Sequence, residues 1–173
     1  MALKYKGGRL SALGDAQDWL VATAGTKKGA RCPCCHLLAK VWKRTVTGSM
    51  AHALVLVAGE TKKGECDPDW WIHIPSLLSR KASGATARGG DYTKLKYWGL
   101  LEKLPGKGTR EDGSPRKALW RITSRGLRFV MNEITIDKYV FTYDDTIIDR
   151  DTRQVGIVDC LGKKFDYQEI LGG

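Results

Sequence analysis

The sequence has no long apolar run. Among its 173 residues, no stretch approaches the roughly 18 consecutive apolar residues that a membrane-spanning helix needs. The segment Met1–Lys6 has none of the apolar character of a secretory signal peptide. Five prolines and 20 glycines are too few for a collagen-like or low-complexity chain. These absences favour a soluble, cytoplasmic, globular protein that does not bind a membrane.

Cysteines number only five, and an odd count argues against a disulfide scaffold. Cys32 and Cys35 form one C-x-x-C pair, the spacing that tetrahedral zinc sites prefer, and Cys66 and His73 are the candidates for two further ligands. A second C-x-x-C, which would complete a zinc ribbon, is missing. We therefore expect free thiols, no metal site and no cofactor. Zinc at Cys32 and Cys35, or a redox role for the pair, is the alternative.

Acidic residues are absent between Trp19 and Gly59, where six basic residues occur. Between Arg80 and Arg128 there are thirteen basic and four acidic residues. The balance reverses over 133–173, with nine acidic and five basic residues, although the whole chain has a net charge of +10. A basic block of domain size followed by an acidic tail is typical of a protein that binds nucleic acid. A basic but simply solvated surface is the alternative.

The sequence contains no recognisable catalytic constellation. None of His36, His52 and His73 lies in a local signature for nucleophilic catalysis, and no glycine-rich loop follows a strand in the pattern that cradles phosphates. The acidic run over 144–151 lies between two alternating segments, which favours a hairpin turn with solvated carboxylates over a metal site. We expect a protein that is not an enzyme, with a divalent-metal nuclease as the enzymatic alternative.

Hydrophobic periodicity predicts an α+β chain in three regions. Residues 1–47 hold a helix over 9–24, a basic linker and a cysteine-bearing strand. Residues 48–133 hold a helix capped by Ser49 and ended by Gly59, a short helix starting at Pro75, and a helix over 91–98. A strand over 100–104, a turn-rich loop, a strand over 117–123 and a helix capped by Ser124 follow. Residues 134–173 form an acidic, β-rich extension.

The helix over 91–98 has an inward and an outward side. Tyr92, Leu95 and Trp98 recur every three residues and predict its core face. The remaining side chains are left for the outside: Thr93, Lys94, Lys96 and Tyr97. On the strand over 117–123, side chains alternate between the two faces, and we expect Trp120 to be buried as a structural residue.

The landmarks that follow this helix are Gly99-Leu100, the loop over 105–115 and Ile122-Thr123-Ser124-Arg125-Gly126. They resemble the winged-helix fold of MarR-like regulators, in which a recognition helix ends in a small residue plus Gly-Leu, a β-hairpin wing follows, and the returning strand ends in Leu/Ile-Thr-x-x-Gly. The stretch over 91–126 is also similar to small winged-helix proteins encoded by phages and prophages. The resemblance covers about half of the chain and implies a winged helix-turn-helix core. It also implies double-stranded DNA binding by a small, phage-type regulator in the cytoplasm or nucleoid of its host.

A helix in the major groove and a hairpin against the neighbouring backbone bring basic side chains to the phosphates. The residues expected to contact nucleic acid are Arg88, Thr93, Lys94, Lys96, Tyr97, Lys103, Lys107, Arg110, Arg116 and Lys117. Of these, Thr93, Lys94 and Tyr97 are the candidates for reading bases. Because winged helices also bind proteins, the alternative is an adaptor or inhibitor of a nucleic-acid-processing complex, docking through its basic face or acidic extension.

Overall fold

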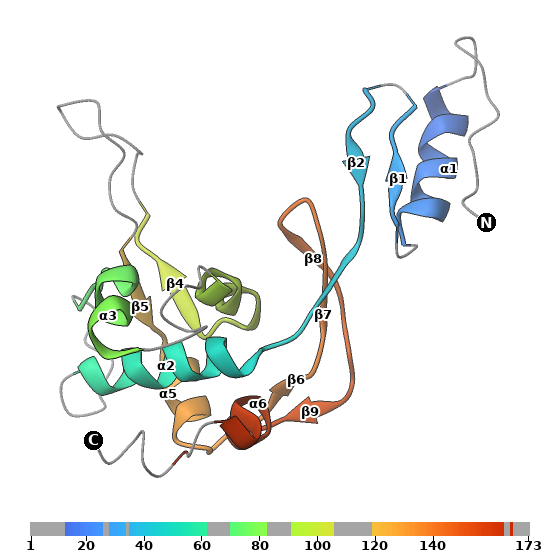
Figure 1. The fold of residues 1–173 in the computed structure, drawn as a ribbon. Coiled ribbons are helices and arrows are strands. Elements are labelled where there is room, and N and C mark those ends of the chain that lie inside the picture. The colour runs from blue at the N-terminus through green and yellow to red at the C-terminus, as the bar shows by residue number, and fades with distance from the viewer. Residues whose placement is uncertain are drawn as a thin grey trace, which may run out of the picture. The chain divides into compact units, whose positions relative to one another are not determined.

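The structure is a computed structural model that describes residues 13–25, 28–33, 35–61, 70–82, 91–105, 119–164 and 167. It is a mixed α and β protein whose elements group into two compact units (Figure 1). Unit 1 comprises residues 1–44 and 139–150, and unit 2 comprises residues 45–138 and 151–173. The expected boundary at residue 47 lies close to the junction at 44 and 45, but the expected extension over 134–173 is divided between the units. Among the described residues, no helix is long and apolar enough to cross a membrane.

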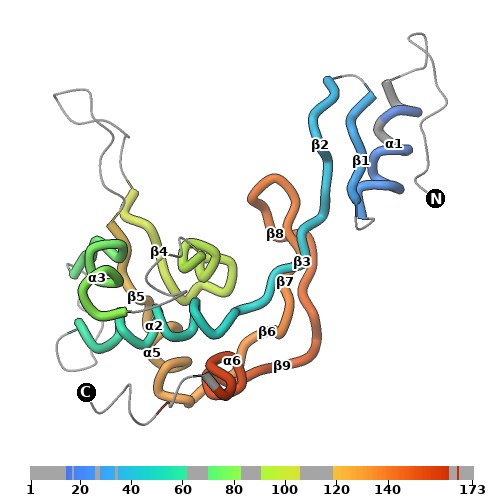
Figure 2. The backbone as a smooth tube through the Cα atoms, in the orientation of Figure 1, coloured from blue at the N-terminus to red at the C-terminus, as the bar shows by residue number. Residues whose placement is uncertain are grey.

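Unit 1 contains helix α1 (Leu13–Ala24), a short hairpin and a three-stranded sheet. Strands β1 (Ala30–Arg31) and β2 (Leu38–Ala39) pair antiparallel beside α1. The sheet has the order β3-β7-β8, with β3 (Trp42–Arg44), β7 (Val140–Tyr143) and β8 (Thr146–Arg150) all antiparallel (Figure 2). Asp144 and Asp145 have φ values of 46° and 61° and form the tight turn between β7 and β8. The hairpin turn predicted for the acidic run is confirmed for Asp144 and Asp145, whereas Asp149 lies within β8 and Asp151 follows it.

Unit 2 is arranged around helix α2 (Gly48–Glu60). This helix packs against α3 (Ile74–Lys81), the 3₁₀ helix η2 (Asp91–Trp98), α5 (Ser124–Val130) and α6 (Ile157–Leu161). Its N-cap is Thr47, whose hydroxyl accepts a hydrogen bond from the backbone N–H of Met50 at 3.4 Å, so the Ser49 cap was wrong. The helix also continues through Gly59 to Glu60. Pro75 lies in the first turn of α3, as predicted, where its missing N–H leaves no bond unmade.

The expected hairpin follows η2. Strands β4 (Leu101–Lys103) and β5 (Trp120–Ile122) pair antiparallel, with Lys103 opposite Trp120. Ile72 exchanges two backbone hydrogen bonds of 2.8 and 2.9 Å with Trp120, so β5 lies between Ile72 and β4. Trp120 itself is only 3% exposed, which confirms that it is a core residue.

The carboxyl-terminal part of unit 2 consists of short elements. Strand β6 (Ile136–Asp137) pairs antiparallel with β9 (Gln154–Val155), and α6 and the 3₁₀ turn η3 (Gly162–Lys164) follow. Ile136, Ile157 and Leu161 are buried, so this segment joins the core of unit 2 through its apolar side chains.

Candidate nucleic-acid interface

η2 is held to unit 2 by one side. Tyr92, Leu95 and Trp98 are buried, as their spacing predicts. The Tyr92 ring meets the Trp120 ring edge to face with centroids 5.8 Å apart, and the indole N–H of Trp98 donates to the Asp137 carbonyl at 2.6 Å. Burial also raises the pKa of the Tyr92 phenol, which keeps it neutral. A helix of eight residues has little stability alone, so these contacts fix its position.

The prediction that Tyr97 faces outward was wrong, because this residue is only 6% exposed. The reason is the geometry of η2, which is a 3₁₀ helix and not an α-helix. In an α-helix, Tyr97 would lie about 160° around the axis from Leu95, whereas three residues per turn bring it to about 120°. The aromatic ring is therefore buried in the core beside the Tyr92, Leu95 and Trp98 triplet.

The same geometry sorts the remaining side chains of η2. Residues three apart eclipse each other in a 3₁₀ helix, and the ammonium group of Lys94 accordingly pairs with the Asp91 carboxylate at 2.5 Å. Lys94 therefore already has a counter-ion. Thr93 and Lys96 share the other outward edge, where Lys96 is exposed and its Nζ lies 5.1 Å from the centroid of the Tyr97 ring. Lys96 is the more exposed of the two lysines of η2.

Thr123 joins η2, the hairpin and α5. Its hydroxyl donates to the carbonyl of Gly99 at 2.6 Å and accepts from the N–H of Gly126 at 2.9 Å. Thr123 is thus the N-cap of α5, and the prediction of a Ser124 cap was wrong. Gly99 has a φ of +67°, which favours glycine where the chain turns from η2 into β4. The Gly-Leu and Thr-x-x-Gly landmarks are therefore the residues that connect these elements.

Gly126 lies where α5 crosses the beginning of β4. A Cβ atom at this position would overlap the carbonyl oxygen of Leu100 and lie 2.7 Å from Cγ1 of Ile122. The glycine of Thr-x-x-Gly is therefore required by close packing of backbone against backbone, and its φ is not positive.

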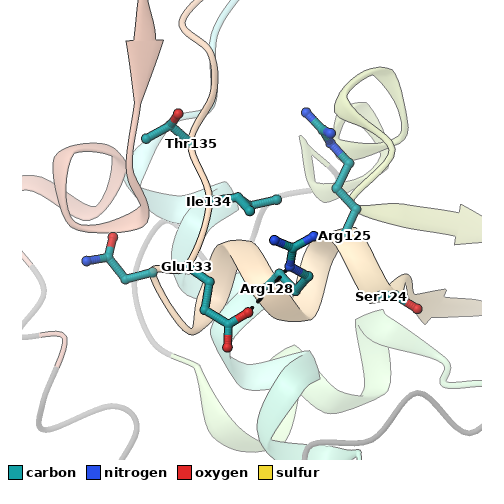
Figure 3. Close-up of a pocket in the computed structure, with 7 residues that line it drawn as sticks. Ser124, Arg125, Arg128, Glu133, Ile134 and Thr135 are labelled. Carbon is teal, nitrogen blue, oxygen red and sulfur yellow. Dashed lines mark ion pairs between the residues drawn. The ribbon is translucent and has the colours of Figure 1, made fainter.

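α5 adds two exposed arginines that were not among the predicted contacts. The Nε–H of Arg125 donates to the carbonyl of Trp98 at 3.1 Å, so this side chain reaches the end of η2. Arg128 pairs with Glu133 at 3.4 Å (Figure 3). Both line an open pocket of about 590 Å³, together with Ser124, Asn132, Glu133, Ile134 and Thr135. Arg125 lies within the Thr-x-x-Gly landmark, between the cap Thr123 and the packed Gly126, so the motif itself was the available signal.

The hairpin contributes Lys103, which is exposed at the end of β4. Glu102 and Arg121 face each other across the hairpin and form an ion pair, and the Arg121 guanidinium carbon lies 4.7 Å from the centroid of the Trp71 ring. The other predicted contacts lie outside the described residues: Arg88, Lys107, Arg110, Arg116 and Lys117.

Cys32 and Cys35 lie in the turn between β1 and β2, half-buried and exposed respectively. The backbone N–H of His36 donates to the Cys32 carbonyl at 2.9 Å and closes this turn. Cys66 lies outside the described residues. Within the described part of the chain, no group of three or more His, Cys, Asp and Glu residues could hold a metal ion.

Cys160 and His52 of unit 2 also have shifted pKa values. Burial, with a smaller effect of Asp159, raises the pKa of the Cys160 thiol to about 11, so this cysteine is protonated and a poor nucleophile at neutral pH. Burial lowers the pKa of His52 on α2, which favours the neutral imidazole.

Comparison of the chain with protein-family models, curated proteins and solved structures gives no match. The functional inference therefore depends on η2, the β4–β5 hairpin and α5.

Proposed function

We propose that the protein binds double-stranded DNA through unit 2, as a small regulator with a winged-helix fold and without enzymatic activity. One observation carries this proposal. η2 leads directly into the hairpin, and Thr123 ties both to α5, so the basic residues Lys96, Lys103 and Arg125 project from a single packed framework. Basic side chains held in fixed positions are what phosphate recognition needs.

The order of the elements supports the proposed winged-helix fold. α2, α3 and η2 precede the hairpin, and β5 returns to the start of α5 at Thr123. In the family that this order resembles, the recognition helix corresponds to η2 and the wing to the segment between β4 and β5. The buried Trp120 fits a hairpin that packs one face against a helical core.

The burial of Tyr97 changes how the DNA contact is expected to work. The outward edge of η2 offers Thr93 to the bases and Lys96 to a phosphate, while Lys94 is paired with Asp91. Phosphate contacts from the basic residues then supply most of the affinity, which makes binding strongly salt-dependent. We expect specificity to be modest and to depend on Thr93.

A salt titration of duplex binding with Lys96→Ala tests this proposal. Loss of one phosphate contact weakens binding uniformly across sequences and lowers the slope of log K against log salt by about 1. The matched control is Lys163→Ala, which removes the same charge from an exposed lysine of the 3₁₀ turn η3, also in unit 2. We expect Lys163→Ala to retain the wild-type slope.

Two results would reject DNA binding through η2. The first is a wild-type chain that does not bind duplex at 50 mM salt, which would leave the protein-adaptor alternative. The second is an equal loss of affinity in Lys96→Ala and Lys163→Ala, which would indicate attraction by net charge without a defined face.

A further inference from the structure

A second basic and aromatic surface lies in unit 1, on the β3-β7-β8 sheet. Trp42 is 45% exposed, with Nζ of Lys40 at 4.3 Å and Cζ of Arg44 at 5.8 Å from its ring centroid. Nζ of Lys43 lies 3.8 Å from the centroid of Tyr139. Significant cation–π pairs occur about once per 70–80 residues in proteins, so a cluster of them within residues 40–44 is a high local density.

The strand register separates the two faces of this sheet. Side chains directly opposite each other on paired strands share a face. Arg44 is paired with Val140, and Val140 is paired with Arg150, so these three residues share one face. Trp42 is on the same face because it lies two residues before Arg44 on the same strand. The one acidic residue within strands β3, β7 and β8 is Asp149. It is paired with Phe141, which is paired with Lys43, so all three lie on the other face of the sheet. We call the first face the Trp42 face; its residues are Lys40, Trp42, Arg44, Val140, Thr142, Ile147 and Arg150, and of these the two β7 residues, Val140 and Thr142, are buried.

The Trp42 face combines an aromatic surface with cations held near it. The Nε–H of Arg44 donates to the Thr142 hydroxyl at 2.9 Å, which positions the guanidinium group. None of the strand residues on this face is acidic, and the sequence has no acid between residues 19 and 59. Nucleic-acid bases stack on exposed aromatic rings while basic side chains follow the phosphates. A duplex keeps its bases stacked inside, so a ring of this kind suits a single strand.

We infer that the Trp42 face binds single-stranded nucleic acid, with one base stacked on Trp42 and the flanking phosphates contacting Lys40, Arg44 and Arg150. A base that stacks on the indole replaces the ammonium group of Lys40, which then turns to the adjacent phosphate. The site lies in unit 1 and is independent of the duplex contact proposed for unit 2.

Fluorescence anisotropy of the full chain with labelled 15-mers tests this inference. The probes are oligothymidine, oligouridine and a mixed-sequence duplex, and the variants are Trp42→Ala and Trp42→Phe. Loss of one base stack lowers single-strand affinity about 5- to 150-fold in Trp42→Ala, and Trp42→Phe retains part of it. Duplex affinity stays at the wild-type value. The tighter of the two single-stranded probes shows whether DNA or RNA is preferred.

Tyr143→Ala is the matched control. This tyrosine is 39% exposed and follows Thr142 on β7, so it lies on the opposite face of the same sheet. The inference is wrong if folded Trp42→Ala binds oligothymidine as tightly as wild type, if Tyr143→Ala loses as much affinity, or if the duplex loses affinity equally.

If Trp42→Ala does not fold, Lys40→Gln tests single-strand binding by the Trp42 face. It keeps the aromatic ring and removes one phosphate contact, which lowers the salt slope for a single strand by about 0.7. An unchanged slope would overturn the inference. Failure of Lys96→Ala to affect duplex binding would reject the proposed function of unit 2 and leave this result unaffected.

Discussion

Gly126→Ala adds a single methyl group where α5 crosses β4. Helix propensity alone favours alanine within a helix by about 1 kcal/mol. The structure instead predicts that Gly126→Ala lowers the free energy of unfolding. The new Cβ would overlap the Leu100 carbonyl oxygen and lie 2.7 Å from Cγ1 of Ile122 and 3.1 Å from the Leu100 carbonyl carbon. A backbone carbonyl cannot rotate away as a flexible side chain would, so α5 has to shift. Overpacking costs about 1–3 kcal/mol, and for so close an approach we expect a net loss of about 2 kcal/mol.

Urea unfolding followed by circular dichroism and tryptophan fluorescence measures this loss as a lower midpoint at unchanged slope. Gly59→Ala is the matched control, since Gly59 lies in helix α2 and a Cβ there would meet no atom within 4 Å. At that position we expect a gain of up to about 1 kcal/mol from propensity and from the less flexible unfolded chain. The packing argument is refuted if Gly126→Ala is as stable as wild type, or if both substitutions change stability in the same direction.

Four further outcomes are expected. Trp120→Ala removes a buried ring and should cost about 3–5 kcal/mol in urea unfolding; a change below 1 kcal/mol would mean that the ring is not a core residue. Thr123→Val removes the α5 cap and should cost about 0.5–2 kcal/mol, which unchanged stability would contradict. The lowered pKa of His52 makes stability highest above its ordinary pKa of 6.5 and decreasing as the pH falls from there to the folded-state pKa; His52→Gln should flatten this slope below pH 6.5, and an identical pH profile would rule out its contribution. Chelation should leave the thermal transition unchanged, whereas a structural zinc at Cys32 and Cys35 would make its removal cost roughly 10 kcal/mol.

Residues whose environment is set by local spacing were predictable from the sequence. Tyr92, Leu95 and Trp98 are buried because a three-residue repeat places them on one side of a helix, whether that helix is α or 3₁₀. Trp120 is buried because side chains alternate along a strand, and this large aromatic residue lies on the face that packs against the core. The aspartate pair at 144 and 145 forms a turn because Asp tolerates positive φ.

Residues whose environment depends on finer geometry were not predictable. The change from 100° to about 120° per residue moved Tyr97 from the expected outer side into the core. The N-caps of α2 and α5 are threonines, not the serines that were predicted. Thr47 and Thr123 have the extended backbone of an N-cap, whereas Ser49 and Ser124 are already helical. In each case the sequence contains a threonine and a serine hydroxyl that could cap the helix. Which one does so depends on which helical residues face the core.

Composition located the basic charge along the chain but could not assign it to a surface. Lys40 and Arg44 flank Trp42, while Lys43 turns to Tyr139 on the other face, and this division depends on pairing between β3 and β7. The hydrogen bond that secures it, from Arg44 to Thr142, joins residues 98 apart in sequence. A slip of one residue in this pairing would move Trp42 to the face that carries Asp149. Whether the charged strand residues on the face of Trp42 are all basic therefore depends on a long-range register, which no local pattern in residues 40–44 encodes.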